Sequence, residues 1–280
     1  MKTRQIGFLD YQLDNYHANV FLDLLNKDLK TRGWKVSKCW AMDEKGGKKW
    51  AAEKNIPYVK DVREMGDCDG IMILAPSNPE THLELTRLAL PLGLPLYVDK
   101  TFTPDYQTAK MIFALADQRR VPLITSSALR CCASLKNLVT QLGKEKICHM
   151  RAWGGGGSFG EYAVHPIEMV VSVMGHKIRR VMHLANGPHH QIQMEFSGGR
   201  TASVFVHIGS ACNFQAMVTT NEKTVHVDCN SDPIFRDLCS LILDFFEARR
   251  ENIDRRESLV IHRILDVAFD KRKHGRFVAL

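Results

Sequence analysis

Lys100 and His165 have side chains that suit proton transfer. An imidazole has an unperturbed pKa near neutrality, and a lysine that is partly removed from water can have its pKa lowered toward the same range. Glu161 lies four residues before His165, where it can orient the imidazole or bind hydroxyl groups. These three residues are therefore candidates for general acid–base chemistry.

The segment that leads to Lys100 predicts a strand–helix–strand unit. Residues 71–74 and 96–98 are apolar runs too short for helices, which indicates two buried strands. The predicted helix between them has one apolar stripe, formed by Leu85, Leu88, Ala89 and Leu92. Strands joined in this way are parallel, and ligands bind beyond the carboxyl ends of parallel strands. We therefore expect Lys100 at the ligand-binding edge of a sheet.

The loop after the first predicted strand, Gln5–Leu9, departs from the usual dinucleotide-binding loop. A glycine-rich G-x-G-x-x-G turn normally lets the backbone approach the pyrophosphate. Residues 10–17 read DYQLDNYH and contain no glycine. Asp10 and Asp14 also put negative charge where two phosphates would lie. The sequence therefore predicts weak dinucleotide binding, or a displaced pyrophosphate, unless these carboxylates turn outward.

Three further polar positions are candidate ligand contacts. Asp43, or its neighbour Glu44, follows the second predicted strand, where a carboxylate can hydrogen-bond a ribose diol. His82 lies near the start of its predicted helix, where it either contacts a cofactor or only packs. Arg130 can hold a substrate oxygen or an anionic group.

The second half of the chain predicts a different kind of sheet. Its strand-like segments are 148–153, 179–184, 191–196, 201–208, 214–220 and 224–228. Apolar and polar residues alternate in several of them, which is typical of an antiparallel sheet with one packed face. The glycine run 154–157 is expected to form a loop, and His189 and His190 a turn. Two helices, near 233–250 and 256–271, are expected to close the chain.

The predicted fold class is α/β with two domains. Residues 1–127 are expected to form a Rossmann-type, doubly wound parallel sheet. Residues 128–280 are expected to form an α/β domain with an open, mostly antiparallel sheet, whose C-terminal helix can pack back on the first domain.

Composition limits the classes of function. The chain has 280 residues, a formal net charge of +7 and eight cysteines without a C-x-x-C pair, which favours free thiols in a reducing cytoplasm. Its basic clusters come with no nucleic-acid-binding motif, so no nucleic-acid partner is expected. No window approaches the ~20 apolar residues of a membrane span, and the first apolar run is too short for a signal peptide. We expect a cytoplasmic protein without a membrane partner.

Three segments together resemble the Gfo/Idh/MocA family of sugar and polyol oxidoreductases, and the resemblance extends over nearly the whole chain. The first, DGIMILAPSNPETHLELTRLALPLGLPLYVDKTFTP, resembles the family's apolar-P-x-x-x-H run that ends in E-K-P. The second, GGGGSFGEYAVHPIEMVVSVMG, resembles its glycine-rich run that ends in D-x-x-x-H. The third, LVIHRILDVAFDKRKHGRFV, resembles its closing helix and Gly-x-x-Val tail. The chain departs from the pattern in lacking the glycine fingerprint, in having Thr101 after Lys100, and in having Glu161 where the family has Asp.

The resemblance implies an NAD(P)-dependent oxidoreductase that acts on a secondary hydroxyl of a sugar, polyol or derivative. It implies catalytic roles for Lys100, His165 and Glu161, with Arg130 as a further substrate contact. The implied cofactor is NAD or NADP, and the residues expected to bind it are Asp10, Tyr11, Gln12, Asn15, His17, Asp43, Pro76, Ser77, His82, Asp99 and Lys100. It also implies a homodimer or homotetramer that assembles through the sheet of the C-terminal domain.

Alternatives to this function remain open at the level of the sequence. Because the glycines are missing, the chain can instead be a redox-inactive sugar-binding or sensor protein, or a redox-neutral lyase or isomerase that holds NAD tightly. His165 and Glu168 have the spacing of metal ligands on a helix, but no third ligand is evident, so no metal site is predicted.

Overall fold

The computed structural model describes residues 3–280 and contains two compact units. The first unit runs to Ser126 and also includes Leu238–Asp254. The second contains Ser127–Asp237 and Arg255–Leu280. The division predicted from the sequence placed all of 128–280 together and allowed the C-terminal helix to pack on the first domain. In the structure, the late segment that joins the first unit comes before the last helix.

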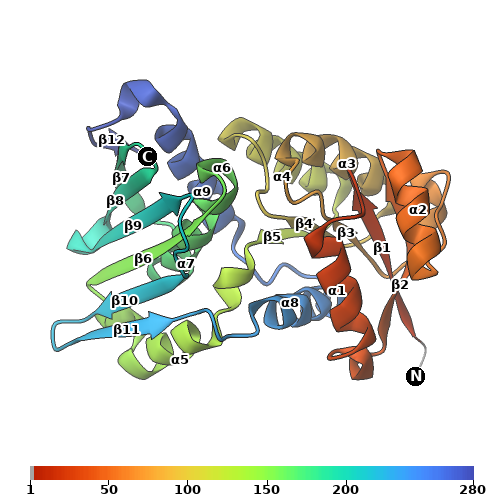
Figure 1. Ribbon diagram of the computed structural model, residues 1–280, viewed down its shortest axis with the longest axis horizontal. Coiled ribbons are helices and arrows are strands. Elements are labelled where there is room, and N and C mark those ends of the chain that lie inside the picture. Colours follow the sequence, from red (N-terminus) through yellow and green to blue (C-terminus); the bar gives the residue numbers. More distant parts are fainter. Residues whose placement is uncertain (1–2) are drawn as a thin grey trace. The chain divides into compact units, whose positions relative to one another are not determined.

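The sheet of the first unit has five parallel strands, in the order β2-β1-β3-β4-β5 (Figure 1). They are β1 (Arg4–Asp10), β2 (Trp34–Ala41), β3 (Gly70–Ile73), β4 (Leu96–Asp99) and β5 (Leu123–Ser126). The chain steps from β1 to β2 on one side and returns to β3 on the other side of β1. The strand order therefore reverses between β1 and β3, which is the switch point where doubly wound folds bind ligands.

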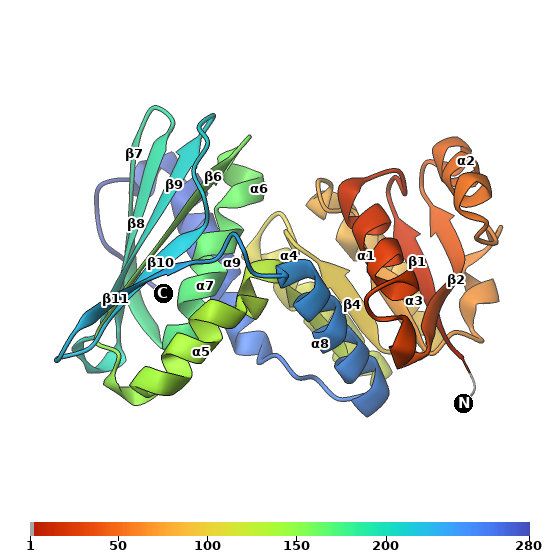
Figure 2. The ribbon, with the colours of Figure 1, turned by 60° about the horizontal axis from the view of Figure 1, so that its bottom comes forward.

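Helices cover both faces of this sheet. They are α1 (Tyr16–Asn26), α2 (Glu44–Lys54), α3 (His82–Ala89), α4 (Tyr106–Arg119) and α8 (Ile234–Ala248). Figures 1 and 2 show α1 and α8 on one face and α3 and α4 on the other. Gly70 leaves room for α8, because a Cβ at this position would lie 2.7 Å from the ring of Phe246. The predicted doubly wound parallel sheet is confirmed.

The second unit contains a seven-stranded sheet in the order β11-β10-β6-β9-β8-β7-β12. Its strands are β6 (His149–Gly156), β7 (Ile178–Asn186), β8 (His189–Phe196), β9 (Thr201–Ile208), β10 (Gln215–Thr219), β11 (Thr224–Asp228) and β12 (Val278–Ala279). Only the β6–β9 pair is parallel among these strands. The prediction of a mostly antiparallel sheet is confirmed.

One face of this second sheet carries the core of the unit. Figure 2 shows α5 (Ala133–Leu142), α7 (Val164–Met174) and α9 (Arg255–Phe269) on that face. The short helix α6 (Phe159–Tyr162) precedes α7. The helices pack on alternate strand residues that are buried, such as Met150 and Ala152 of β6 and Val204 of β9. The residues between them lie on the opposite face.

Two local predictions in this unit were wrong. Gly154–Gly156 are part of strand β6, where a Cβ on Gly154 would lie 2.1 Å from the Phe214 ring and one on Gly156 would lie 2.2 Å from the Tyr162 ring. The glycines are needed for this close packing and do not break the strand. His189 and His190 begin strand β8, and the turn is made earlier by Gly187, which has a φ of +56°.

Three imidazoles form a cluster at one end of this sheet. His183 Nδ1 lies 3.0 Å from His274 Nε2, and His183 Nε2 lies 3.1 Å from His190 Nδ1. The Phe159 ring of α6 stacks on His190 at a centroid distance of 4.2 Å. Burial and the two neighbouring imidazoles lower the pKa of His183 to about 4. His183 is therefore uncharged at neutral pH, and the cluster connects α6 to strands β7 and β8.

Candidate active site

In the first unit, Asp99 organises the polar groups at the carboxyl end of β4. Its Oδ1 accepts hydrogen bonds from the Tyr97 hydroxyl at 2.9 Å and from the Lys100 backbone N–H at 2.8 Å. Its Oδ2 is in contact with Nδ1 of His17, in the first turn of α1. Burial alone would raise the pKa of Asp99, but the charges of His17 and Lys100 hold it below its ordinary value. Asp99 is therefore an anion held inside the unit.

Lys100 lies beside this anion at the predicted edge of the sheet. The residue is only 9% exposed, and its Nζ donates to the backbone carbonyl of Pro76 at 3.3 Å. Pro76 belongs to the loop that follows β3, so the ammonium group connects the carboxyl ends of two neighbouring strands. A cation held in this position can hydrogen-bond an oxygen of a bound ligand.

Asp10 turns inward at the end of β1. It is 1% exposed, and it accepts hydrogen bonds from the backbone N–H groups of Gln12 at 3.1 Å and Ala75 at 2.9 Å. Asn15 Nδ2 donates to its other oxygen at 2.8 Å. Burial raises the pKa of Asp10 to about 7, although these three hydrogen bonds act in the opposite direction. Asp14, in contrast, is exposed.

His82 is fully buried between two loops. Its Nδ1 lies 2.8 Å from the Phe102 carbonyl, and its Nε2 lies 2.9 Å from the Leu74 carbonyl. Burial lowers the pKa of His82, so the neutral ring donates one N–H to one carbonyl at a time. The ring ties the loop after β3 to the loop after β4, which is a packing role. Its predicted contact with a cofactor stays a prediction.

The remaining predicted cofactor contacts of the first unit fall into two groups. Tyr11, Gln12 and Ser77 are exposed at the carboxyl ends of β1 and β3, where a ligand can reach them. Asp43 and Asn15 serve as helix N-caps: Asp43 accepts from the Gly46 N–H at 3.2 Å, and Asn15 accepts from the Ala18 N–H at 3.0 Å. Asp43 is also exposed, so a bound ribose would compete with the cap for this carboxylate.

In the second unit, His165 is paired with Ser127. The Ser127 Oγ lies 2.6 Å from His165 Nδ1, and the rings of Tyr162 and Phe214 pack edge-on against the imidazole at centroid distances of 5.8 and 5.3 Å. These contacts fix both the position and the plane of the imidazole. When Nδ1 carries the proton and donates it to Ser127, the basic lone pair is on Nε2.

Behind this pair lies a buried ion-pair network. Arg130 Nε donates to Glu168 at 2.7 Å, and its NH1 group donates to Glu257 at 2.7 Å. Glu168 also accepts the backbone N–H of Ser127 at 2.8 Å. Its neighbouring carboxylates hold the pKa of Arg130 above its ordinary value, against the effect of burial. The predicted substrate contact by Arg130 therefore competes with two internal carboxylates for its guanidinium group.

Glu161 is half-buried in α6, four residues before His165. Its backbone N–H donates to the Ser158 Oγ at 3.3 Å, and the same hydroxyl donates to the Glu161 carboxylate at 3.2 Å. Glu161 thus completes the N-cap of α6.

Ser127, Glu168 and Glu257 were not identified as site residues from the sequence. Ser127 had a usable signal, because it directly follows strand β5. Glu168 was considered only as a metal ligand, on the basis of its spacing from His165. Within residues 3–280, no group of three or more His, Cys, Asp and Glu side chains is arranged to hold a metal ion. Glu257 lies 89 positions further along the chain, and nothing in the sequence connects it to Arg130.

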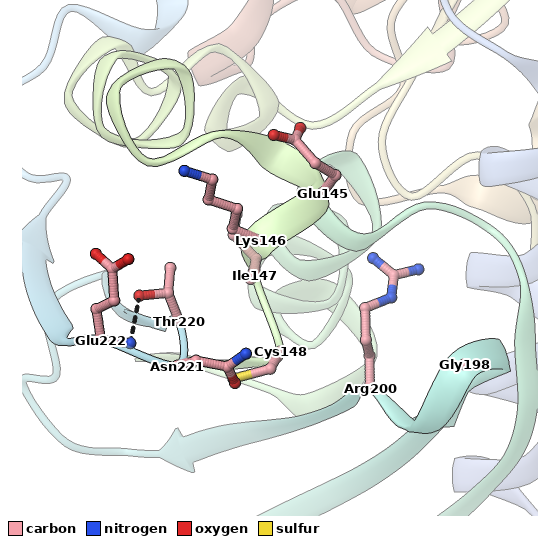
Figure 3. Close-up of a pocket in the computed structure, with 9 residues that line it drawn as sticks. All are labelled: Glu145, Lys146, Ile147, Cys148, Gly198, Arg200, Thr220, Asn221 and Glu222. Atoms are coloured by element: carbon pink, nitrogen blue, oxygen red, sulfur yellow. Dashed lines mark hydrogen bonds between the residues drawn. The ribbon is translucent and has the colours of Figure 1, made fainter.

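A separate pocket of about 410 Å³ lies at the far end of the second sheet, near the start of β6 (Figure 3). Lys146, Arg200, Glu145 and Glu222 line it, so the pocket has charges of both signs. None of the predicted site residues belongs to it.

No helix in the described part of the chain is long and apolar enough to cross a membrane.

Known proteins resemble this chain in fold more than in sequence. No protein-family model matches it. The Salmonella typhimurium protein YceM, described as a candidate oxidoreductase, is 24% identical over 144 residues. That match covers 51% of this chain and 45% of YceM, so the chain aligns with about half of that relative.

Solved structures match nearly the full length of the chain. The myo-inositol 2-dehydrogenase of Lactobacillus plantarum has a TM-score of 0.82 at 15% identity, over 100% of both chains. The myo-inositol dehydrogenase of Corynebacterium glutamicum has a TM-score of 0.83 at 12% identity, over 99% of both. GenD2 from gentamicin A biosynthesis, crystallised in complex with NAD, has a TM-score of 0.83 at 13% identity, over 100% of this chain and 97% of its own.

A Rossmann-type unit combined with an open, mostly antiparallel sheet defines a class of two-domain α/β folds. Within that class, this chain has the Gfo/Idh/MocA fold, as the resemblance in sequence implied.

Proposed function

We propose that this protein is an NAD(P)-dependent oxidoreductase that acts on a secondary hydroxyl of a sugar, polyol or related compound. The observation that carries the proposal is the His165 imidazole, held at Nδ1 by Ser127 and clamped by two aromatic rings. A general base needs a fixed imidazole whose second nitrogen can take a proton. The match in fold to inositol dehydrogenases supports the same class of substrate.

The residues of the first unit fit one end of a dinucleotide better than its middle. Lys100 Nζ and the Pro76 carbonyl offer a donor and an acceptor at the carboxyl ends of β4 and β3, which suits a nicotinamide ring and its ribose. The Asp10–Asn15 loop has no glycine and carries a buried carboxyl group, so a pyrophosphate cannot approach its backbone closely. When bound, the cofactor would accept a hydride from the carbinol carbon.

The protein's own groups would then handle the proton and the oxygen. His165 takes the hydroxyl proton at Nε2, while its Nδ1–H donates a hydrogen bond to Ser127 Oγ throughout, so the imidazolium that forms stays in place. In the first unit, the Lys100 ammonium group would hydrogen-bond an oxygen of the bound ligand and stabilise negative charge on it. Glu161 binds neighbouring hydroxyl groups of the substrate.

The test is turnover with NAD and with NADP on a panel of polyols and sugars that includes myo-inositol, followed by reduced-nicotinamide absorbance. Lys100→Met and His165→Asn are each expected to lower kcat by at least 100-fold. No turnover with any member of the panel would contradict the proposal.

The inward-facing Asp10 favours a second candidate, a ligand-binding or redox-neutral protein of the same fold. Native mass measurement on the purified protein, together with the turnover assay, distinguishes these candidates from the proposed oxidoreductase. A retained nicotinamide cofactor without net turnover supports a redox-neutral enzyme. Sugar binding without any cofactor supports a sensor protein.

A further inference from the structure

Three polar residues stand at the glycine positions of the loop after β1. Asp10, Gln12 and Asn15 have the spacing of the first, second and third glycines of G-x-G-x-x-G. In dinucleotide-binding folds those glycines let the backbone come close to a pyrophosphate at the switch point of the sheet. A side chain at any of the three positions therefore bears directly on how a pyrophosphate binds.

Asp10 bridges the switch point between β1 and β3. The two strands are paired with Leu9 opposite Ile73, so the residues that follow them lie side by side. Asp10 ends β1, and its Oδ1 accepts the N–H of Ala75, just past the end of β3, at 2.9 Å. The same oxygen accepts the Gln12 N–H at 3.1 Å. One carboxyl group thus takes backbone donors from both sides of the crevice.

Asn15, at the third glycine position, uses its side chain for hydrogen bonds within the loop. Asn15 Nδ2 donates to Asp10 Oδ2 at 2.8 Å and to the Gln12 carbonyl at 2.6 Å. Asn15 Oδ1 accepts the Ala18 N–H, one of the first amides of α1, at 3.0 Å. Helix-start amides are the groups that normally bind phosphate oxygens. In this loop a side chain takes one of them.

The backbone conformation of Ala75 is consistent with a loop that the Asp10 hydrogen bond holds in place. Ala75 has a φ of +38°, in the left-handed region that a residue with a Cβ rarely adopts. Such a conformation persists where surrounding contacts hold it. The hydrogen bond to Asp10 is one of those contacts. Asp10 is 1% exposed, and the nearby Asp99 adds a like charge.

We propose that Asp10 determines the cofactor affinity of this site, because its carboxyl group occupies the backbone donors that a dinucleotide pyrophosphate would otherwise take. The protein then binds a dinucleotide weakly, and it contacts parts of the cofactor other than its pyrophosphate. This inference rests on the proposed function, since it concerns the site at which NAD(P) would bind.

Calorimetric titration with ADP-ribose, which contains the pyrophosphate, and adenosine, which does not, tests the inference. Asp10→Gly is expected to tighten the binding of ADP-ribose at least 10-fold and to change that of adenosine less than twofold. Asp10→Asn removes the charge but can keep the contacts to Gln12 and Ala75, so a smaller gain, of at least threefold, is expected. Asp14→Asn, an exposed carboxylate of the same loop, is the matched control and should change neither ligand.

Two results would overturn the inference. One is submicromolar binding of ADP-ribose by the native protein. The other is a gain of less than threefold in Asp10→Ala, which also frees the Gln12 and Ala75 donors and decides the matter if Asp10→Gly does not fold in a thermal melt. A different result would contradict the proposed function without affecting the role of Asp10. A gain in ADP-ribose affinity without turnover of NAD or NADP would sustain the role of Asp10 and remove the redox activity.

Discussion

Ser127 contacts the imidazole of His165 with its hydroxyl and the carboxylate of Glu168 with its backbone N–H, at 2.6 and 2.8 Å. One residue therefore connects the candidate base to the buried ion-pair network behind it. Ser127 thus fixes the imidazole within the second unit.

Replacing Ser127 by Ala should leave the unit folded but release the His165 ring from one tautomer. We expect the ring ¹⁵N chemical shifts of His165 to move toward the average of the two tautomers, and kcat to fall roughly 10- to 100-fold with KM little changed. Ser203→Ala, which removes a hydroxyl from the sheet, is the control. Unchanged nitrogen shifts would show that Ser127 does not orient the ring.

The Arg130 network should be sensitive to the loss of a single partner. Glu168→Gln removes one of the two carboxylates that pair with the buried Arg130 and leaves Glu257 as its charged partner, and we expect the free energy of unfolding to fall by about 1.5–3 kcal/mol, the size of a lost hydrogen bond to a charged group. Glu195→Gln, which breaks the exposed pair with Arg180, should have no measurable effect in the same urea titration. Equal losses in the two variants would contradict the assignment of a structural role to the buried network.

Stability should fall in mild acid because of His183. Its pKa is about 4 in the folded protein and near 6.5 in the unfolded chain, so below pH 6.5 the unfolded state takes up a proton that the folded state does not. The free energy of unfolding should therefore decrease as the pH falls from 6.5 to 4, by up to about 3 kcal/mol. Urea titrations across this range, repeated on His183→Gln, should show a shallower pH dependence in the variant. A dependence of the same steepness would assign the effect to other groups.

The face of the second sheet opposite its helices is predicted to mediate self-association. Trp153 pairs with Phe205 across β6 and β9, and Arg151 pairs with Met217 across β6 and β10, so these side chains share that face. An open sheet with apolar groups on both faces needs a cover for the second. We expect a homodimer or homotetramer by light scattering at micromolar concentration, and a monomer for Phe205→Arg. Leu88→Arg on α3 is the control, and a monomeric native protein would refute the prediction.

The sequence predicted the fold well because both sheets have clear periodicity. Strands β3 and β4 are four residues each and fully buried, and they contain the short apolar runs that a buried parallel strand requires, with Asp99 as the last residue of β4. The prediction of a loop at the glycine run 154–157 was wrong for a physical reason. Glycine usually breaks a strand, but Gly154 lies under the ring of Phe214, sixty residues away, and Gly156 under the ring of Tyr162 from helix α6.

The site assignments stay predictions. Lys100 and His165 were selected from the sequence because their residue types suit proton transfer and because of the elements predicted to precede them. The partners of Arg130 could not be predicted, since Glu168 and Glu257 reach it only through the packing of α7 and α9. The inward turn of Asp10 depends on the Ala75 amide, 65 residues away, and no local pattern encodes that contact.

The late position of helix α8 in the sequence affects how the first unit folds during synthesis. It packs against Gly70 and Trp34 of the first unit, yet it is synthesised more than a hundred residues after β5 is complete. At typical rates of synthesis, the sheet face that α8 covers stays bare for on the order of ten seconds. During that time the nascent first unit exposes apolar surface, which makes it a candidate substrate for chaperones that bind chains on the ribosome. A shortened chain that stops after Ser126 would keep that exposed face permanently and would be expected to aggregate.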